Sequence, residues 1–179
     1  MTRFVALLRG INVGGTRKLP MAELRTQAGK LGWRDVATYI QSGNLVFTAT
    51  GKAPALEAEL ETALARHFGF EVPTLVRSAR EWSALVAANP LPELAEADSA
   101  HLLVGLTKAK PRKEALAELR ARAQGKERVE LAGGALWLHY ADGVARSKLT
   151  PAVLDRAVGS TVTARNWRTV LELERLLAG

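Results

Sequence analysis

The 179-residue sequence contains no cysteine. Disulfide frameworks, thiolate nucleophiles, zinc ribbons and iron–sulfur clusters are therefore excluded. No apolar stretch approaches the roughly 20 residues that a membrane-spanning helix needs, and the apolar run near the start is too short for a secretory signal with a cleavage site. We therefore expect a cytoplasmic protein that has no membrane partner.

Several nucleotide-binding and catalytic motifs are missing too. Gly10 and Gly15 have the spacing of a P-loop, but Thr16 and Arg17 stand where that motif needs Lys and then Ser or Thr. No G-x-G-x-x-G fingerprint occurs, and Ser42 lacks the G-x-S-x-G elbow of a nucleophilic serine. We therefore expect no cofactor. The sequence identifies no catalytic residue and leaves open whether the protein is an enzyme.

The three histidines, His67, His101 and His139, are far apart in the sequence and show no metal-ligand spacing such as H-E-x-x-H. A lone histidine is more often structural than a ligand. We therefore predict structural roles for all three and no metal site.

The positive charge is unevenly distributed along the chain. Residues 1–98 hold 11 basic and 10 acidic side chains, whereas residues 99–179 hold 14 and 8, so the net charge of +7 is almost confined to the second half. Such a balance favours an anionic partner for the second half, although net charge also serves solubility.

Hydrophobic periodicity and turn residues predict the same order of elements twice. The first half reads strand, helix, two strands joined at Ser42-Gly43-Asn44, helix, strand and helix, over residues 3–10, 21–32, 35–50, 54–69, 71–78 and 79–89. After a connector at 89–99 the order recurs over residues 101–107, 111–123, 127–132, 135–141, 150–159, 161–165 and 167–177.

This repetition predicts an α+β fold, a tandem duplication of two ferredoxin-like (βαββαβ) units with antiparallel sheets, each carrying an extra helix. We place the halves at residues 1–95 and 96–179 and expect them to pack as one compact unit. Several strands are apolar on both sides, so the face of each sheet opposite the helices must also be covered, by the extra helices, the other half or another subunit.

The predicted topology brings polar residues of the first half together, because the first strand–helix loop and the strand hairpin lie at the same end of the sheet. The loops offer glycine N–H groups, cations and amide or hydroxyl side chains, the parts from which anion sites are built. Well-capped turns would need many of the same residue types. The candidate ligand-binding residues here are Arg9, Asn12, Gly14, Gly15, Gln41, Ser42 and Asn44, with Arg17 and Lys18 beside them.

A second candidate cluster lies at the opposite end of the second sheet, where two segments join strands to helices. Thr150 with Pro151, and Asn166, fit helix N-termini, but capping does not explain two of the cations. The candidate ligand-binding residues here are Ser147, Lys148, Arg165 and Asn166. If the two halves pack in inverted orientation, both clusters line one cleft.

The segments LLRGINVGG, MAEL, TYIQSGNLVF, ANP, SK and TARNWRTV resemble the bacterial family of domains of unknown function numbered 1697 (DUF1697), in order and spacing, from residue 4 to about residue 177. The resemblance implies an α+β fold with an internal duplication, and it brings no established activity. Ala164, before the R-N-W triplet, departs from the pattern. The polar positions that the resemblance marks are Arg9, Asn12, Gln41, Ser42, Asn44, Ser147, Lys148, Arg165 and Asn166.

Three functions remain open. The first is binding of an anionic or phosphorylated small molecule at the polar loop clusters. The second is nucleic-acid binding by the basic second half, which the KAKPRK segment favours, while the low aromatic content of 6% and the absence of an RNP1-like motif count against it. The third is a non-catalytic interaction protein that associates through apolar sheet faces, so the sequence allows both a monomer and a homodimer.

Overall fold

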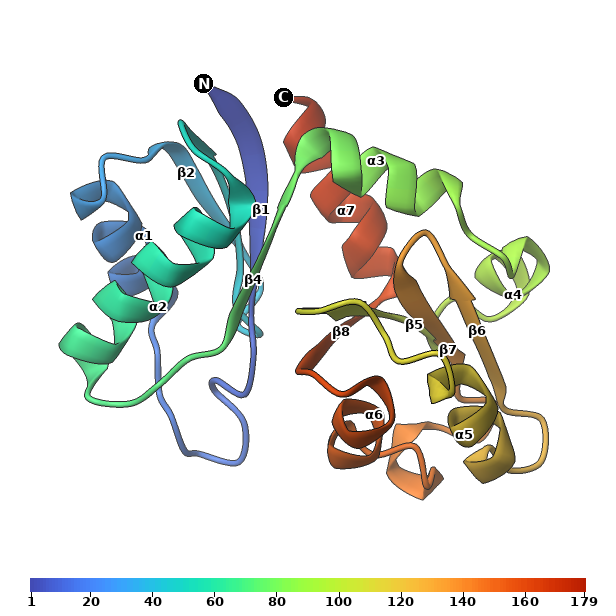
Figure 1. Ribbon diagram of the computed structural model, residues 1–179. Helices are drawn as coiled ribbons and strands as arrows, with labels where there is room; N and C mark the ends of the chain where they lie inside the picture. The colour runs from blue at the N-terminus through green and yellow to red at the C-terminus, as the bar shows by residue number, and fades with distance from the viewer. The chain divides into compact units, whose positions relative to one another are not determined.

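The computed structural model describes residues 1–179 and contains two four-stranded antiparallel sheets (Figure 1). The first sheet has the strand order β2-β3-β1-β4, so β2 and β3 form a hairpin and β1 pairs with β3 and β4. Its strands and the helices that follow them are β1 (Thr2–Leu8), α1 (Met21–Lys30), β2 (Arg34–Tyr39), β3 (Asn44–Ala49), α2 (Ala53–Phe68), β4 (Thr74–Ser78) and α3 (Ala79–Ala87).

The second sheet repeats this arrangement with the strand order β6-β7-β5-β8. None of the helices has the length and apolar character that crossing a membrane requires. The elements after α3 are α4 (Pro92–Ala97), β5 (Leu102–Thr107), α5 (Ala115–Arg122), β6 (Arg128–Ala132), β7 (Ala135–His139), η1 (Val144–Arg146), α6 (Pro151–Val158), β8 (Val162–Asn166) and α7 (Trp167–Ala178).

The pairing register repeats together with the strand order. Val5 of β1 pairs with Arg77 of β4, and Val104 of β5 pairs with Arg165 of β8. The two arginines therefore occupy equivalent positions, each followed by a polar residue and then a helix. The predicted α+β fold, with two ferredoxin-like units in tandem and an extra helix in each, is confirmed.

The proximity of backbone positions divides the chain into two compact units, Met1–Trp82 with Leu173–Gly179, and Ser83–Glu172. The division falls inside α3 and α7, the helices that follow the last strand of each sheet. A domain boundary near residue 95, with the two halves packed as one, stays a prediction.

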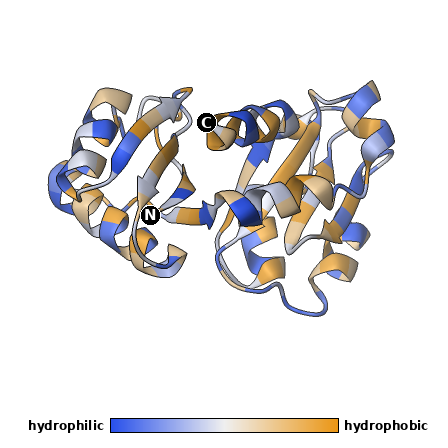
Figure 2. Cartoon of the chain, turned by 90° about the horizontal axis from the view of Figure 1, so that it is seen from above, coloured by the Kyte–Doolittle hydropathy of each residue, from blue (hydrophilic) through white to orange (hydrophobic).

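Each unit has a core between its sheet and a pair of helices, because the helices carry apolar residues at helical spacing and the strands point every second residue toward them. Figure 2 shows the hydrophobic residues gathered along the strands of both sheets. In the first core the rings of Trp33 and Phe47 stack with centroids 3.9 Å apart. The buried residues of this core include Phe4, Ala6, Leu8, Leu24, Leu56, Leu60 and Leu64, and those of the second include Leu119, Leu136, Leu138, Leu154 and Val162.

The sheet face opposite these helices is also buried within the single chain; Val5, for example, is 0% exposed. In the first unit Arg3 Nη2 donates to the carbonyl of Leu176, 2.9 Å away, so the end of α7 lies against this sheet. In the second unit a Cβ added to Gly133, in the β6–β7 turn, would lie 2.9 Å from Ala88 Cβ, just after α3. The extra helices therefore help to cover the sheet faces that lie opposite the core helices. This is one of the three kinds of covering expected from the sequence.

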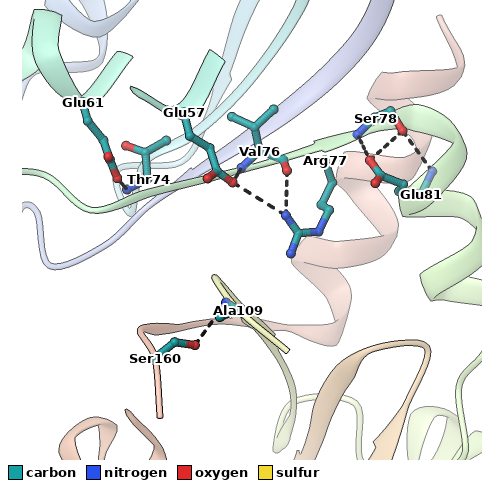
Figure 3. Close-up of polar contacts among 9 residues, drawn as sticks. All are labelled: Glu57, Glu61, Thr74, Val76, Arg77, Ser78, Glu81, Ala109 and Ser160. Atoms are coloured by element: carbon teal, nitrogen blue, oxygen red, sulfur yellow. Dashed lines mark hydrogen bonds and ion pairs between the residues drawn. The ribbon is translucent and has the colours of Figure 1, made fainter. Parts of the chain in front are cut away.

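Strand β4 lies at the edge of the first sheet, where its outward N–H groups need partners. Helix α2 supplies them: Glu61 Oε1 accepts from Thr74 N–H and Glu57 Oε1 accepts from Val76 N–H, each at 2.8 Å (Figure 3). Glu57 Oε1 also lies 3.7 Å from Arg77 Nη1. The two carboxylates thus close the edge of the sheet against pairing with another chain.

Three local features differ from the sequence-based expectation. The connector at 89–99 contains the short helix α4, in which the Ala95 N–H donates to the carbonyl of the buried Leu91. The helix predicted over 111–123 spans only Ala115–Arg122. The preceding Arg112 instead donates from Nε to the carbonyl of Ala157, at the end of α6, over 2.9 Å. The turn η1 had no signal in the sequence.

Tyr140 is buried in the second core, and its hydroxyl donates to the carbonyl of Leu149 over 3.1 Å. Burial, with a smaller effect of Glu127, raises the pKa of Tyr140 to about 12. The folded state thus keeps a proton that the unfolded state loses near pH 10, so the free energy of unfolding should fall as the pH rises from about 10 toward 12. Urea titrations at several pH values should show this loss, and Tyr140→Phe should reduce its slope; an equal slope in both proteins would contradict the assignment.

Candidate functional site

Two loops of the first sheet meet beyond the end of β1. The Leu8 N–H donates to the carbonyl of Gly43 over 2.8 Å, and Asn12 Nδ2 donates to the carbonyl of Gln41 over 2.9 Å. The Arg9 N–H donates to the carbonyl of Pro73 over 2.9 Å, which adds the loop that enters β4. Seven of the predicted site residues therefore lie at one end of one sheet, six on these loops and one at the start of β3: Arg9, Asn12, Gly14, Gly15, Gln41, Ser42 and Asn44.

Asn12 fixes the shape of the first loop. Its Nδ2 also donates to the carbonyl of Leu19, and its Oδ1 accepts from the Leu19 N–H, over 2.9 and 2.8 Å. Its backbone N–H donates to the carbonyl of Arg17, and its φ of 55° lies in the left-handed region. Both hydrogens of the amide are thus donated within the two loops, so the side chain of Asn12 fastens the loops to each other.

The loop between β1 and α1 folds into a small hairpin of its own. Val13 and Thr16 form an antiparallel bridge, and between them Gly14 and Gly15 have φ values of 60° and 75°. Positive φ at both central residues is the type I′ geometry that favours glycine. Both glycines are exposed, so their N–H groups stand at the surface.

The β2–β3 hairpin is held by Asn44, which is 0% exposed. Asn44 Nδ2 donates to the carbonyl of Tyr39 over 2.8 Å and to Ser42 Oγ over 3.1 Å. Like Asn12, Asn44 is used inside the loops, whereas Gln41 and Ser42 are exposed. The residues able to face a ligand are therefore fewer than the sequence suggested.

The charges at this end are mainly positive. Arg17 has a φ of 47°, and its Nη1 lies 3.6 Å from the position that a Cβ on Gly10 would occupy, so the guanidinium folds back over the start of the loop. No acidic residue occurs in residues 1–22 or 36–56, and the loop that enters β4 contributes Glu71. A non-glycine residue at positive φ, such as Arg17, strains the backbone. Residues strained in this way are found most often at functional sites.

The second predicted cluster is divided among different roles. Asn166 Nδ2 donates to the carbonyls of Ser99 and Ala100 over 3.1 and 2.8 Å, and its Oδ1 accepts from the Arg168 N–H. Ser147 Oγ accepts from the Leu149 N–H over 2.9 Å, and Lys148 is exposed. Ser147 thus holds a local turn, whereas Asn166 caps the start of α7 and also joins the end of β8 to the segment before β5.

Arg165 projects from the face of the second sheet that lies away from α5 and α6, since it alternates with Val162 and Ala164 along β8. Its Nη1 donates to the carbonyl of Ala164 over 2.9 Å. Desolvation lowers the pKa of Arg165 to about 10.

Arg77 makes the equivalent contact in the first unit, where its Nη1 donates to the carbonyl of the preceding residue, Val76, over 2.8 Å. Arg77 is not among the residues predicted from the sequence. The pattern that could have indicated it is an arginine at the same distance before the extra helix in each half of the chain.

These features define an α+β protein with duplicated ferredoxin-like units. At one end of the first sheet it carries a cationic loop pair, residues 9–18 and 40–44. The chain belongs to the family described as "Protein of unknown function (DUF1697)", which matches residues 1–137. The resemblance found in the sequence is therefore confirmed over these residues, and the SK and TARNWRTV segments lie beyond the match. A similar solved structure is that of the conserved bacterial protein SP0830 from Streptococcus pneumoniae, with 27% identity, a TM-score of 0.79 and 98% of each chain covered. Comparison with curated proteins finds no match.

Proposed function

We propose that the protein binds a small molecule carrying a phosphate or carboxylate group at the cationic loop pair, which consists of residues 9–18 and 40–44. The observation that carries the proposal is the loop of residues 9–18, held by Asn12 in a shape in which the Arg17 guanidinium folds back over Gly10. Guanidinium groups bind phosphate and carboxylate through paired hydrogen bonds, and exposed glycine N–H groups add donors without side-chain bulk.

The ligand would be held by charge and by backbone donors. Arg9 and Arg17 supply the charge, Gly14 and Gly15 offer N–H groups, and Gln41 and Ser42 extend exposed polar groups from the facing hairpin. No imidazole or carboxylate belongs to this set, so we propose recognition here and assign no reaction.

The nucleic-acid alternative loses part of its basis in the second unit. Arg112 binds Glu118 over 2.9 Å, and Arg120 and Arg128 both approach Glu130. Two carboxylates thus offset two of these three arginine charges locally, and cations paired in this way add less to a phosphate-binding surface. We therefore place the small-molecule proposal first.

The test is thermal unfolding of the protein in inorganic pyrophosphate at constant ionic strength. Saturating ligand should raise Tm, and removal of a charge-assisted partner should weaken binding by about tenfold. We therefore expect Arg9→Ala and Arg17→Ala to lose most of the Tm shift while keeping the circular dichroism spectrum of the parent.

Lys30→Ala is the matched control, because Lys30 is an exposed cation at the far end of α1. It removes the same charge and should keep the full Tm shift. Equal shifts in all three variants would mean that pyrophosphate acts through general charge, and the proposal would then be wrong. A single-stranded oligonucleotide assayed in parallel tests the alternative, since its binding should fall steeply with salt if it is real.

A further inference from the structure

The second unit contains a cluster of three titratable side chains, in which one carboxylate is hydrogen-bonded to two imidazole rings. Asp98 Oδ1 lies 2.8 Å from His101 Nδ1, and its Oδ2 lies 2.8 Å from His139 Nε2. We propose that Asp98, His101 and His139 form a phosphoryl-acceptor site in which Nε2 of His101 takes a phosphoryl group from a small phosphoramidate or acyl phosphate. The inference is independent of the proposed function, because it concerns other residues and another ligand chemistry.

The hydrogen bond to Asp98 decides which ring nitrogen of His101 can react. A carboxylate only accepts hydrogen bonds, so His101 Nδ1 must carry the proton. In the neutral ring the lone pair then resides on Nε2, and the side chain of His101 is 44% exposed, so a small reagent can reach the ring. A base or nucleophile oriented by a third group is the general pattern of activated side chains.

His139 orients the carboxylate in turn. Its side chain is only 7% exposed, and its Nδ1 is buried without a hydrogen-bond partner. Because a proton on Nδ1 would be a buried unpaired donor, the neutral tautomer with the proton on Nε2 fits the site. The hydrogen bonds from His139 and then His101 lower the pKa of Asp98, so the carboxylate stays charged beside the reacting ring.

The surroundings of His101 favour a phosphoryl group over a neutral one. Arg168 Nε donates to Ser99 Oγ over 2.8 Å, which places a guanidinium by the segment that carries His101. Asn166, at the end of β8, donates hydrogen bonds to the carbonyls of Ser99 and Ala100 and so fixes the segment before His101. The remaining N–H groups of the exposed Arg168 are donors of the kind that bind phosphoryl oxygens.

The chemical step balances without another reactant. The Nε2 lone pair attacks phosphorus, and the bond from phosphorus to the leaving group breaks. Ammonia leaves from the zwitterionic form of phosphoramidate, whose nitrogen already carries three protons, or a carboxylate leaves from an acyl phosphate, in each case with the electron pair of that bond. The ring then carries the phosphoryl group on Nε2 and the proton on Nδ1, and the positive charge that this places on the ring is stabilised by Asp98. No group of three or more acidic or histidine side chains in the protein, this cluster included, is arranged to hold a metal ion.

His67 provides an internal comparison. It is exposed to a similar degree, 38%, and also pairs with a carboxylate, but through Nε2, which lies 2.7 Å from Glu23 Oε2. The two histidines are thus matched in exposure and in pairing with a carboxylate. They differ in the ring nitrogen that is not paired, which is Nδ1 in His67 and Nε2 in His101. Any preference for His101 must therefore come from its arrangement and not from accessibility.

The experiment incubates the full chain with phosphoramidate and follows each histidine by peptide mapping under alkaline conditions, which preserve phosphohistidine. We expect His101 to be modified at Nε2 at least about tenfold faster than His67, within the range of general-base and orientation effects. Asp98→Asn should remove this advantage, whereas the matched variant Glu23→Gln should leave the rate at His101 unchanged. Near-UV circular dichroism checks that each variant is folded.

Similar rates at His67 and His101 in the unmodified protein would overturn the proposal, and so would attachment at Nδ1 of His101. These two measurements need no variant, so they decide the question even if Asp98→Asn does not fold. A folded Asp98→Asn protein in which His101 keeps its full rate would show that the carboxylate is only structural.

Discussion

Replacing Gly43 with alanine should lower the free energy of unfolding by about 2–5 kcal/mol, because the change adds backbone strain to a steric clash. Gly43 has a φ of 86°, which an L-residue adopts at a cost. An added Cβ would lie 2.6 Å from Ile11 Cδ1 and 2.8 Å from Leu8 Cβ. The β2–β3 hairpin would therefore have to move away from the β1–α1 loop.

Gly134 is a suitable control for this prediction. It lies in the corresponding hairpin of the second sheet with a φ of 75°, and nothing stands within 4 Å of an added Cβ. Gly134→Ala should therefore cost only the strain of positive φ, about 1–2 kcal/mol. Urea unfolding of both variants measures the difference, and equal losses would mean that the close approach of the two loops does not contribute.

The fold could be predicted because its signals are local and occur twice. The apolar spacing of Leu56, Leu60 and Leu64 marks a buried helix face, and Gly133-Gly134 marks a hairpin. The short helix α4 and the late start of α5 could not be predicted in this way. They depend on Leu91 being buried and on Arg112 bonding to the end of another helix, which are contacts between distant residues.

The candidate site was only partly accessible to sequence analysis. Topology was enough to bring Asn12 and Gln41 to one end of the sheet. The sequence could not show that the side chains of Asn12 and Asn44 are used to hold the loops, because a ligand-binding amide and a loop-fastening amide are the same residue type. The pairing of His101 and His139 through Asp98 was also hidden, since His139 is 41 residues from Asp98 and no motif connects them.

The second large effect is expected at Asn12, because this one side chain makes three hydrogen bonds and its backbone is left-handed. Hydrogen bonds of this kind contribute about 0.5–1.5 kcal/mol each, and alanine at positive φ adds about 1 kcal/mol of strain. Asn12→Ala should therefore lower the free energy of unfolding by about 2.5–5.5 kcal/mol in urea titrations. It should also abolish the pyrophosphate-dependent Tm shift, since the loop no longer holds the Arg17 guanidinium over Gly10.

Asn12→Gly separates the two contributions, because glycine accepts the left-handed backbone but makes none of the side-chain hydrogen bonds. We expect it to be more stable than Asn12→Ala by about 1 kcal/mol and still to lose the Tm shift. If Asn12→Gly kept the full shift, the shape of the loop would not depend on the amide, and the anion site would have to rest on the charges of Arg9 and Arg17 alone. Loss of the shift with a retained circular dichroism spectrum would instead show that a residue with no free donor controls binding by fixing the backbone around it.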